Sequence, residues 1–307
     1  MNQFQLPSEA HVGHVRLQVA DMERSLAFYG ELLGFREISH NGDTVALSST
    51  GQLPYHIVLT ERRGAQPKPP RTTGLYHVAI RFPTRHTLAR TVMRLATHNW
   101  PFQGAADHLV SEALYLADPD GNGLELYVDR PRDRWYRQDD QIAMATEPLD
   151  LEDLLSEGAK NPESWSGAHP ETEIGHVHLQ VSDLKRAEKF YHDLLGLDIT
   201  QRGYPGALFM SAGGYHHHLA VNVWAGVGAP QPPPDAVGLL SFALQIPDGE
   251  AWQMVLARMA AAGLEVTEQP DNGYAQSALV RDPDGTTVEL LHQIHQLPNN
   301  ERKEVEK

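Results

Sequence analysis

Alternating and helical patterns of apolar residues follow one another in a fixed order at the start of the chain. The segment VRLQV alternates as a half-buried strand does, and MERSLAFYGELLG then repeats apolar residues at helical spacing. Asp21 stands where a helix N-cap is expected, and Gly34 stands where the helix should end. Three more alternating runs, FREIS, TVALS and HIVLT, are separated by turn residues such as Asn41-Gly42. The pattern predicts a βαβββ unit.

The same pattern recurs along the chain. The segment GHVRLQVADMERSLAFYGELLGF from Gly13 matches GHVHLQVSDLKRAEKFYHDLLGL from Gly175. GLYHVAIRFP from Gly74 likewise matches GLLSFALQIP from Gly238, and DPDGNGLEL matches DPDGTTVEL. Repeats that keep one register over such lengths indicate a duplicated half. Since each half contains two βαβββ units, we predict an α+β fold of four modules in two pseudo-repeated halves.

The repeat also predicts the domain organisation. Modules one and two form an N-terminal half (residues 10–130), residues 131–172 form a connector, and modules three and four form a C-terminal half (residues 173–295). Within the connector, LDLEDLLSEG has the spacing of a short helix. The run RPRDRWYRQDD from Arg130 is strongly charged, which is typical of a solvated segment.

Seven of eight equivalent strand positions carry side chains that can bind a metal. The first-strand residues of modules one to four are His14, His77, His176 and Ser241, and the last-strand residues are His56, Glu125, His218 and Glu289. A single histidine in a strand is ordinarily a structural residue. Because burying an uncompensated imidazole or carboxylate is costly, seven such coincidences favour a metal site.

The glutamate of module two differs in its neighbours from the glutamate of module four. In DHLVSEALYLADPDGNGLEL, His108 and Tyr115 precede Glu125. The matching positions before Glu289 hold Asn272 and Leu279. The DPDG segment alone predicts only a turn. Because polar side chains accompany only one of the two glutamates, Glu125 is the candidate for a reaction.

These features resemble the vicinal oxygen chelate superfamily and, within it, the type I extradiol ring-cleaving dioxygenases, most closely the catechol 2,3-dioxygenase group. The resemblance rests on strand-initial histidines, on the βαβββ modules and on the spacing of His108, Leu114-Tyr115, Asp118-Pro119, Gly121 and Glu125. It implies that the modules form barrels. It also implies an enzyme that opens catechol-type aromatic diols with O₂ to 2-hydroxymuconate semialdehyde-type products at a non-haem Fe(II) site, with Mn(II) as the alternative metal.

The resemblance implies a metal face of two histidines and one carboxylate, and it leaves open which modules share a barrel. Modules two and three together would supply His77, Glu125 and His176. We favour this pairing because only module three contains tandem histidines, in GGYHHHLAVNVW. Other pairings would use the alternative ligands His14, His56 and Glu289.

The resemblance also implies the catalytic residues. The tandem-histidine stretch corresponds to a strand that carries the acid/base in this family, and the match falls on His218. Tyr115 and His108 would then hydrogen-bond to the substrate oxygens. Two other functions remain open, a metal-dependent isomerase similar to glyoxalase I and a non-catalytic protein that sequesters a ligand.

Composition narrows the range of partners. There are 25 Lys and Arg against 40 Asp and Glu, a net charge of −15 that disfavours nucleic acid and anionic lipid surfaces. Cysteine is absent, which excludes disulfides and thiolate sites. No apolar run approaches the about 20 residues of a transmembrane helix. We therefore expect a cytoplasmic homo-oligomer whose partners are a small aromatic diol and O₂.

Overall fold

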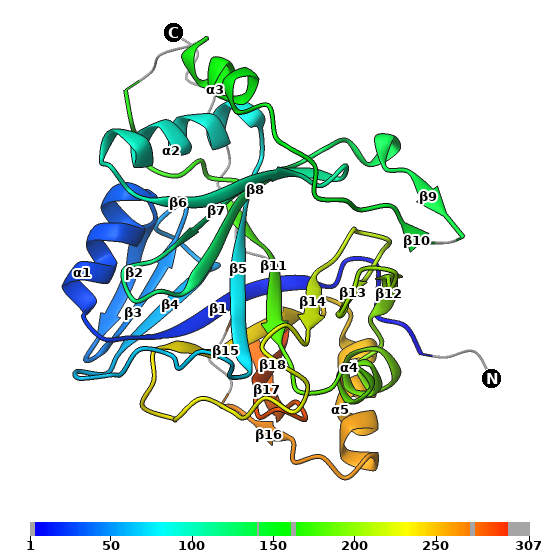
Figure 1. The fold of residues 1–307 in the computed structure, drawn as a ribbon. Helices are drawn as coiled ribbons and strands as arrows, with labels where there is room; N and C mark the ends of the chain where they lie inside the picture. Colours follow the sequence, from blue (N-terminus) through cyan, green and yellow to red (C-terminus); the bar gives the residue numbers. More distant parts are fainter. Residues whose placement is uncertain (1–3, 140, 161–163, 271–273, 294–307) are drawn as a thin grey trace, which may run out of the picture.

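The computed structural model describes residues 4–139, 141–160, 164–270 and 274–293. All four modules form a strand, a helix and three further strands, so the predicted α+β fold is confirmed (Figure 1). Module one comprises β1 (His11–Val19), α1 (Met22–Leu26), η1 (Ala27–Leu32), β2 (Arg36–Asn41), β3 (Thr44–Ser48) and β4 (Ile57–Glu61). Module two comprises β5 (Gly74–Phe82), α2 (Arg85–Thr97), β6 (Phe102–Asp107), β7 (Ser111–Ala117) and β8 (Gly123–Asp129).

The second half repeats this order of elements. Module three comprises β11 (Glu173–Gln180), α4 (Leu184–Glu188), η3 (Lys189–Leu194), β12 (Asp198–Gln201), β13 (Ala207–Ser211) and β14 (Leu219–Asn222). Module four comprises β15 (Gly238–Gln245), α5 (Gly249–Ala261), β16 (Thr267–Glu268), β17 (Ala275–Arg281) and β18 (Thr287–Gln293). The connector contains η2 (Arg132–Arg134), β9 (Arg137–Gln138), β10 (Gln141–Ile142) and α3 (Leu151–Ala159).

Each large sheet takes one module from each half of the chain. One sheet has the order β16-β17-β18-β15-β1-β4-β3-β2, and the other has the order β12-β13-β14-β11-β5-β8-β7-β6. The first strands of the paired modules are antiparallel neighbours, β1 with β15 and β11 with β5. Modules two and three therefore share a sheet, which is the pairing favoured from the sequence.

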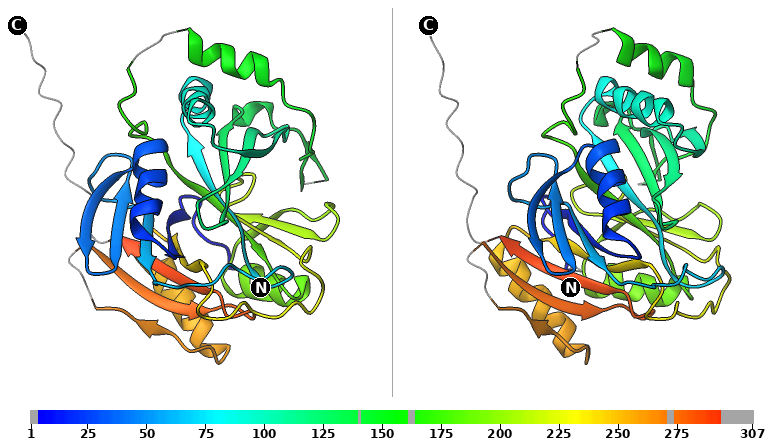
Figure 2. Two further views of the ribbon diagram at one scale, coloured as in Figure 1. Left: turned by 60° about the vertical axis from the view of Figure 1, so that its left-hand side comes forward. Right: turned by 90° about the vertical axis from the view of Figure 1, so that its left-hand side faces the viewer.

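Local sequence signals account for the helix starts and the turns. The side chain of Asp21 accepts a hydrogen bond from the backbone N–H of Arg24, as an N-cap does. Its repeat partner Asp183 caps α4 in the same way. Between β2 and β3, Gly42 has φ +62°, a conformation that glycine adopts without strain. The helices lie outside the sheets, and α2 packs alongside α3 (Figure 2).

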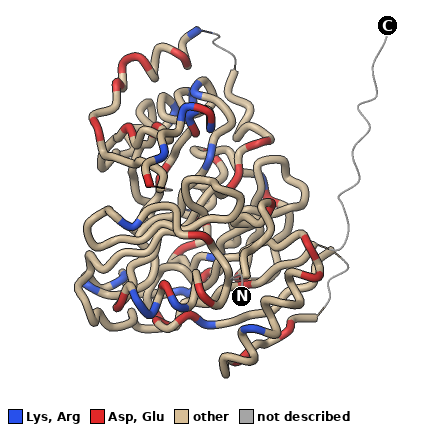
Figure 3. The backbone as a smooth tube through the Cα atoms, turned by 90° about the vertical axis from the view of Figure 1, so that its right-hand side faces the viewer, with Lys and Arg blue, Asp and Glu red and all other residues tan. Residues whose placement is uncertain are grey.

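The connector is less solvated than its charge suggests. Trp135 is only 8% exposed and packs with Val110, Ile142 and Tyr215. The interpretation of RPRDRWYRQDD as a solvated segment is therefore wrong at Trp135, because that side chain belongs to a small core shared by the connector, module two and module three. Acidic positions are spread over much of the molecule rather than gathered at one place (Figure 3). Among the described helices, none has the length and apolar character needed to cross a bilayer.

Candidate active site

Three buried donor atoms from three neighbouring strands converge in the sheet of modules two and three. Nε2 of His77 lies 3.0 Å from Oε2 of Glu125, and Nε2 of His176 lies 3.2 Å from the same oxygen. The two imidazole nitrogens are 3.4 Å apart. Within the described ranges, this is the only group of three such residues close enough to hold one metal ion.

Strand register explains why these side chains meet. His176 on β11 stands opposite Ala79 on β5, and Ala79 is in turn paired with Glu125 on β8. His77 lies two residues before Ala79, so its side chain points to the same face of the sheet. Tyr115 on β7 pairs directly with Glu125 and joins that face. The first strands β5 and β11, the last strand β8 and its neighbour β7 thus bring all four side chains to one place.

The geometry and charge of the three donors suit a divalent cation. Ligand atoms bound at right angles about 2.1 Å from one ion lie about 3 Å apart, close to the observed separations. Burial by itself raises the pKa of Glu125, but His176 and His77 hold this pKa well below its ordinary value. The carboxylate is therefore ionised. Two imidazoles and one carboxylate can together hold a metal with coordination positions left open.

Two of the three donors reach a cavity of about 530 Å³. His77 and Glu125 line it, together with Tyr115, His108 and His217. This volume is within the range of small-molecule sites. The side chains at the cavity include several titratable groups, which is common where a protein carries out chemistry.

A hydrogen-bonded chain orients the polar pair beside Glu125. The Nδ1 atom of His108 lies 2.6 Å from the carbonyl oxygen of Ala145, so this nitrogen carries the hydrogen. Nε2 of His108 then accepts the hydrogen bond of the Tyr115 hydroxyl. Burial raises the pKa of Tyr115, which keeps the phenol protonated. The free lone pairs of the Tyr115 oxygen remain available for a ligand's hydroxyl group.

The structure places His217, rather than His218, at the cavity. The ring of His217 packs 4.0 Å, centroid to centroid, from the ring of His176. His218 instead stacks on Tyr215 at 4.8 Å and lines a separate cavity of about 280 Å³ with Arg132. His217 and His218 lie in the irregular segment just before β14, and their adjacent side chains face different cavities. The assignment of His218 to this cavity is corrected accordingly.

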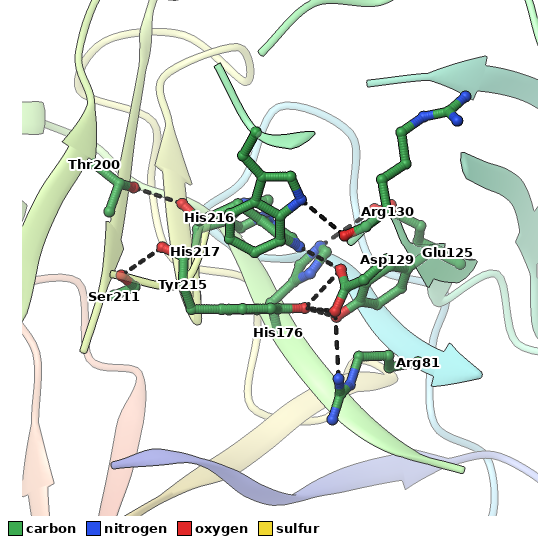
Figure 4. Close-up of polar contacts among 12 residues, drawn as sticks. Arg81, Glu125, Asp129, Arg130, His176, Thr200, Ser211, Tyr215, His216 and His217 are labelled. Carbon is green, nitrogen blue, oxygen red and sulfur yellow. Dashed lines mark hydrogen bonds and ion pairs between the residues drawn. The ribbon is translucent and has the colours of Figure 1, made fainter. Parts of the chain in front are cut away.

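His217 is held by a chain of polar groups that ends at a buried carboxylate. Its Nδ1 lies 2.8 Å from Nδ1 of His216, whose Nε2 lies 2.9 Å from Oδ1 of Asp129. Asp129 also accepts hydrogen bonds from Tyr215 and Arg81 (Figure 4). Burial raises the pKa of Asp129, but His216 and Arg81 hold it below its ordinary value.

This arrangement fixes the tautomers of the two histidines. The ionised Asp129 carboxylate can only accept a hydrogen bond, so Nε2 of His216 donates to it. With its hydrogen at Nε2, His216 accepts at Nδ1 from the Nδ1–H of His217. The Nε2 atom of His217 is left as an unprotonated nitrogen.

The sheet of modules one and four has an incomplete copy of this site. Nε2 of His14 lies 3.1 Å from Oε2 of Glu289, but the third position is Ser241. Tyr55, the counterpart of His217, packs 4.6 Å from the His14 ring, and the cavity there is only about 10 Å³. The alternative ligands therefore do not form a three-donor group within the described residues.

Three further residues of modules one and four are counterparts of residues considered for the candidate site. His56, the counterpart of His218, accepts a backbone hydrogen bond from Ser49 at Nδ1. Leu279 pairs with Glu289 as Tyr115 pairs with Glu125. Asn272 lies outside the described residues.

Sequence reasoning missed the contribution of the connector. Met144, Ala145 and Thr146 line the cavity, and the Ala145 carbonyl orients His108. The bridge between Asp107 and Glu147 brings this segment against module two. The only signal of this contribution in the sequence is Met144, an apolar residue within a polar connector. This signal does not show which wall of the cavity the methionine would join.

Known proteins with similar sequences point to one superfamily. A family model described as the Glyoxalase/Bleomycin resistance protein/Dioxygenase superfamily matches residues 11–126 and 173–290. The chain is 42% identical over 279 residues to a catechol-2,3-dioxygenase of Bacillus subtilis (strain 168), covering 90% of this chain and 94% of that protein. It is 30% identical over 118 residues to biphenyl-2,3-diol 1,2-dioxygenase 3 of Rhodococcus globerulus, covering 38% and 61%.

Solved structures share the fold at low sequence identity. One from Bacillus subtilis subsp. subtilis str. 168 aligns with a TM-score of 0.67 at 15% identity, covering 96% of this chain and 87% of the other. Glyoxalase I from Zea mays aligns with a TM-score of 0.55 at 18% identity, covering 92% of each chain. These likenesses support the four-module architecture.

Proposed function

The chain belongs to the Glyoxalase/Bleomycin resistance protein/Dioxygenase superfamily, and on this premise we propose that it is an extradiol dioxygenase that opens catechol-type rings with O₂. The observation that carries the proposal is the convergence of His77, Glu125 and His176 beside a cavity that His77 and Glu125 line together with Tyr115 and His217. The strong identity to a named catechol-2,3-dioxygenase supports the same reaction.

His77, Glu125 and His176 would hold Fe(II), with Mn(II) as the alternative. Such an ion, when bound, would chelate both diol oxygens, lower the pKa of their hydroxyl groups and couple the ring to O₂. The overall reaction inserts both atoms of O₂ into the diol and breaks the ring bond beside the two hydroxylated carbons. The product is a 2-hydroxymuconate semialdehyde, and no external reductant is needed.

His217 is proposed as the group that accepts the substrate proton, in place of His218. Its Nδ1 is hydrogen-bonded to His216, so the unprotonated Nε2 is the nitrogen that can take a hydroxyl proton and later return it. Asp129 would stabilise the positive charge that then forms across the two histidines. His216 and Asp129 are therefore positioning residues.

Tyr115 and His108 would orient the diol. The Tyr115 hydroxyl donates to Nε2 of His108, which leaves the Tyr115 oxygen to accept a hydrogen bond from a substrate hydroxyl. The Ala145 carbonyl accepts the hydrogen of His108 Nδ1 and so favours this tautomer. Two fixed groups beside the metal ligands would thus select one orientation of the diol.

The isomerase alternative is less well supported by the donor set. By the family resemblance it uses glutamates from the last strands of both modules, whereas Glu125 is the only carboxylate that lines the described cavity. The other alternative, a non-catalytic protein that sequesters a ligand, would not need a cluster of metal ligands.

The proposal is tested with protein reconstituted anaerobically with Fe(II) and then mixed with catechol in air. We expect one O₂ consumed per catechol and a yellow ring-opened product. Catechol consumed without that product, or no O₂ uptake by the iron-loaded protein, would overturn the proposal.

A further inference from the structure

The cavity is larger than a single diol ring requires. Its volume is about 530 Å³, whereas a cavity of about 150 Å³ holds one benzene ring. A catechol bound at the donor atoms would therefore leave most of the space unfilled. A substrate that fills this space would gain binding energy from its substituent.

One side of the cavity is an aromatic wall formed by Tyr76, Tyr204, Phe209 and Trp224. Phe209 lies 5.0 Å from the ring of His217, and successive centroids from Phe209 to Tyr204 and from Tyr204 to Trp224 are 6.0 and 6.1 Å apart. Phe209 is 8% exposed, whereas Trp224 is 44% exposed. The wall therefore leads from the reacting groups towards the solvent.

Met144 of the connector extends the apolar surface. It packs against the core pair Phe209 and Ala207 and beside Tyr204. An unbranched thioether adapts its shape to different ligand groups. Val110 lines the cavity as well. Trp224 and Tyr76 are large, exposed aromatic residues at the mouth of the cavity. Exposed apolar surface of this kind marks a ligand site.

The charges around the cavity are as informative as its size. No Arg or Lys is present among the described residues that line it, and its one carboxylate is Glu125. A carboxylate substituent that lies along the aromatic wall would lose hydration there without gaining a cationic side chain as a partner. A neutral substituent would not bear this cost.

We infer that the preferred substrate is an uncharged catechol with a bulky alkyl or aryl substituent, and that the cavity discriminates against carboxylated catechols. This inference rests on the proposed ring-cleaving function and specifies its substrate class. The substituent would lie along the aromatic wall, while the two hydroxyl groups lie beside His77, Glu125 and His176.

The test compares kcat/KM for matched substrates with the Fe(II)-loaded protein. The first pair is 3,4-dihydroxybenzoate and its methyl ester. The two differ in charge, but both substituents withdraw electrons from the ring. The second pair, 2,3-dihydroxybenzoate and its methyl ester, repeats the comparison with the substituent next to a hydroxyl group. For at least one of the two pairs, we expect kcat/KM of the ester to exceed kcat/KM of the acid by about tenfold or more. Differences of this size are usual when a pocket discriminates between substrates. We also expect at least one isopropylcatechol isomer to exceed unsubstituted catechol.

The outcomes separate this inference from the proposed function. If catechol is cleaved but the acids equal or exceed their esters, or neither isopropyl isomer exceeds catechol, the inference is overturned while ring cleavage stands. If catechol and all substituted catechols remain intact, the proposed function itself fails.

A variant pair tests the role of the aromatic wall. Trp224→Arg places a cation at the mouth and should lower the ester-to-acid ratio of kcat/KM by about tenfold or more. Tyr136→Arg adds the same charge at a 66% exposed aromatic residue outside the cavity and should leave the ratio unchanged. Equal ratios in the two variants would contradict the placement of the substituent at Trp224.

Discussion

The Nε2 atom of His176 lies 3.2 Å from Oε2 of Glu125, although the two residues belong to different halves of the duplicated chain. The contact exists because β11 and β5 pair across the halves. Neither half alone contains the three donors, so the candidate site depends on the exchange of modules between two sheets.

Replacing Glu125 should remove metal binding. Glu125→Gln deletes the only anionic donor of the group, and we expect metal affinity to fall by at least about 100-fold. The matched control is Glu289→Gln, which alters the incomplete copy beside His14 and should retain the metal. Metal content after anaerobic reconstitution and desalting measures both. Equal loss in the two variants would refute the assignment of Glu125.

Replacing His217 should slow turnover without releasing the metal. His217→Asn removes the nitrogen that accepts the substrate proton, and kcat should fall by about 10²–10⁴. His218→Asn changes the neighbouring ring that faces the other cavity, and its kcat should stay close to that of the parent protein. Steady-state kinetics alongside metal content distinguishes the two. The reverse pattern would restore the original assignment to His218.

Asp129 should affect kcat through His216 and His217. Asp129→Asn removes the ionised acceptor, so the tautomer of His216 is no longer fixed and the charge on the histidine pair loses its counterion. We expect kcat to fall by about tenfold with little change in KM. Steady-state kinetics at saturating and limiting catechol supplies both values. A change confined to KM would mean that Asp129 shapes binding instead.

The repeated DPDG turn predicts a pH effect on stability. Burial raises the pKa of Asp282 to about 6, although the hydroxyl of Tyr191 donates to it. Because the folded protein then binds this proton more tightly than the unfolded chain does, stability falls as pH rises between about 4 and 6. The loss is about 3 kcal/mol for a shift of roughly two pKa units.

Asp282→Asn should flatten this part of the stability profile. The free energy of unfolding, measured with urea at pH values from 4 to 7, should decline less in the variant than in the parent protein. Parallel profiles would show that Asp282 titrates near its ordinary pKa.

The sequence predicted the modules and the three donors because both depend on repetition. A constant register over two halves marks equivalent positions, so His77, Glu125 and His176 can be recognised without knowing any contact. The tandem histidines also indicated the correct pairing of modules. What the sequence could not resolve was which of the adjacent histidines faces the cavity, because the backbone before β14 leaves the repeat of a regular strand.

The sequence also could not predict contacts between segments that lie far apart along the chain. The hydrogen bond from His108 to Ala145 joins module two to the connector, and Trp135 of the connector packs with Val110 of module two and Tyr215 of module three. Neither segment has a periodic pattern of apolar residues that would indicate which part of the chain it packs against. Such contacts follow from how the sheets pack, and packing is not encoded in any single local pattern.

One metal site, in the sheet of modules two and three, is central to the proposed function. The most direct measurement is the metal content per chain of His176→Ala and His14→Ala, each reconstituted anaerobically with Fe(II) beside the parent protein. His176→Ala should lose the metal, whereas His14→Ala should keep about one ion per chain, as the parent protein does. Loss of metal from His14→Ala with retention in His176→Ala would contradict the account and move the site to the other sheet.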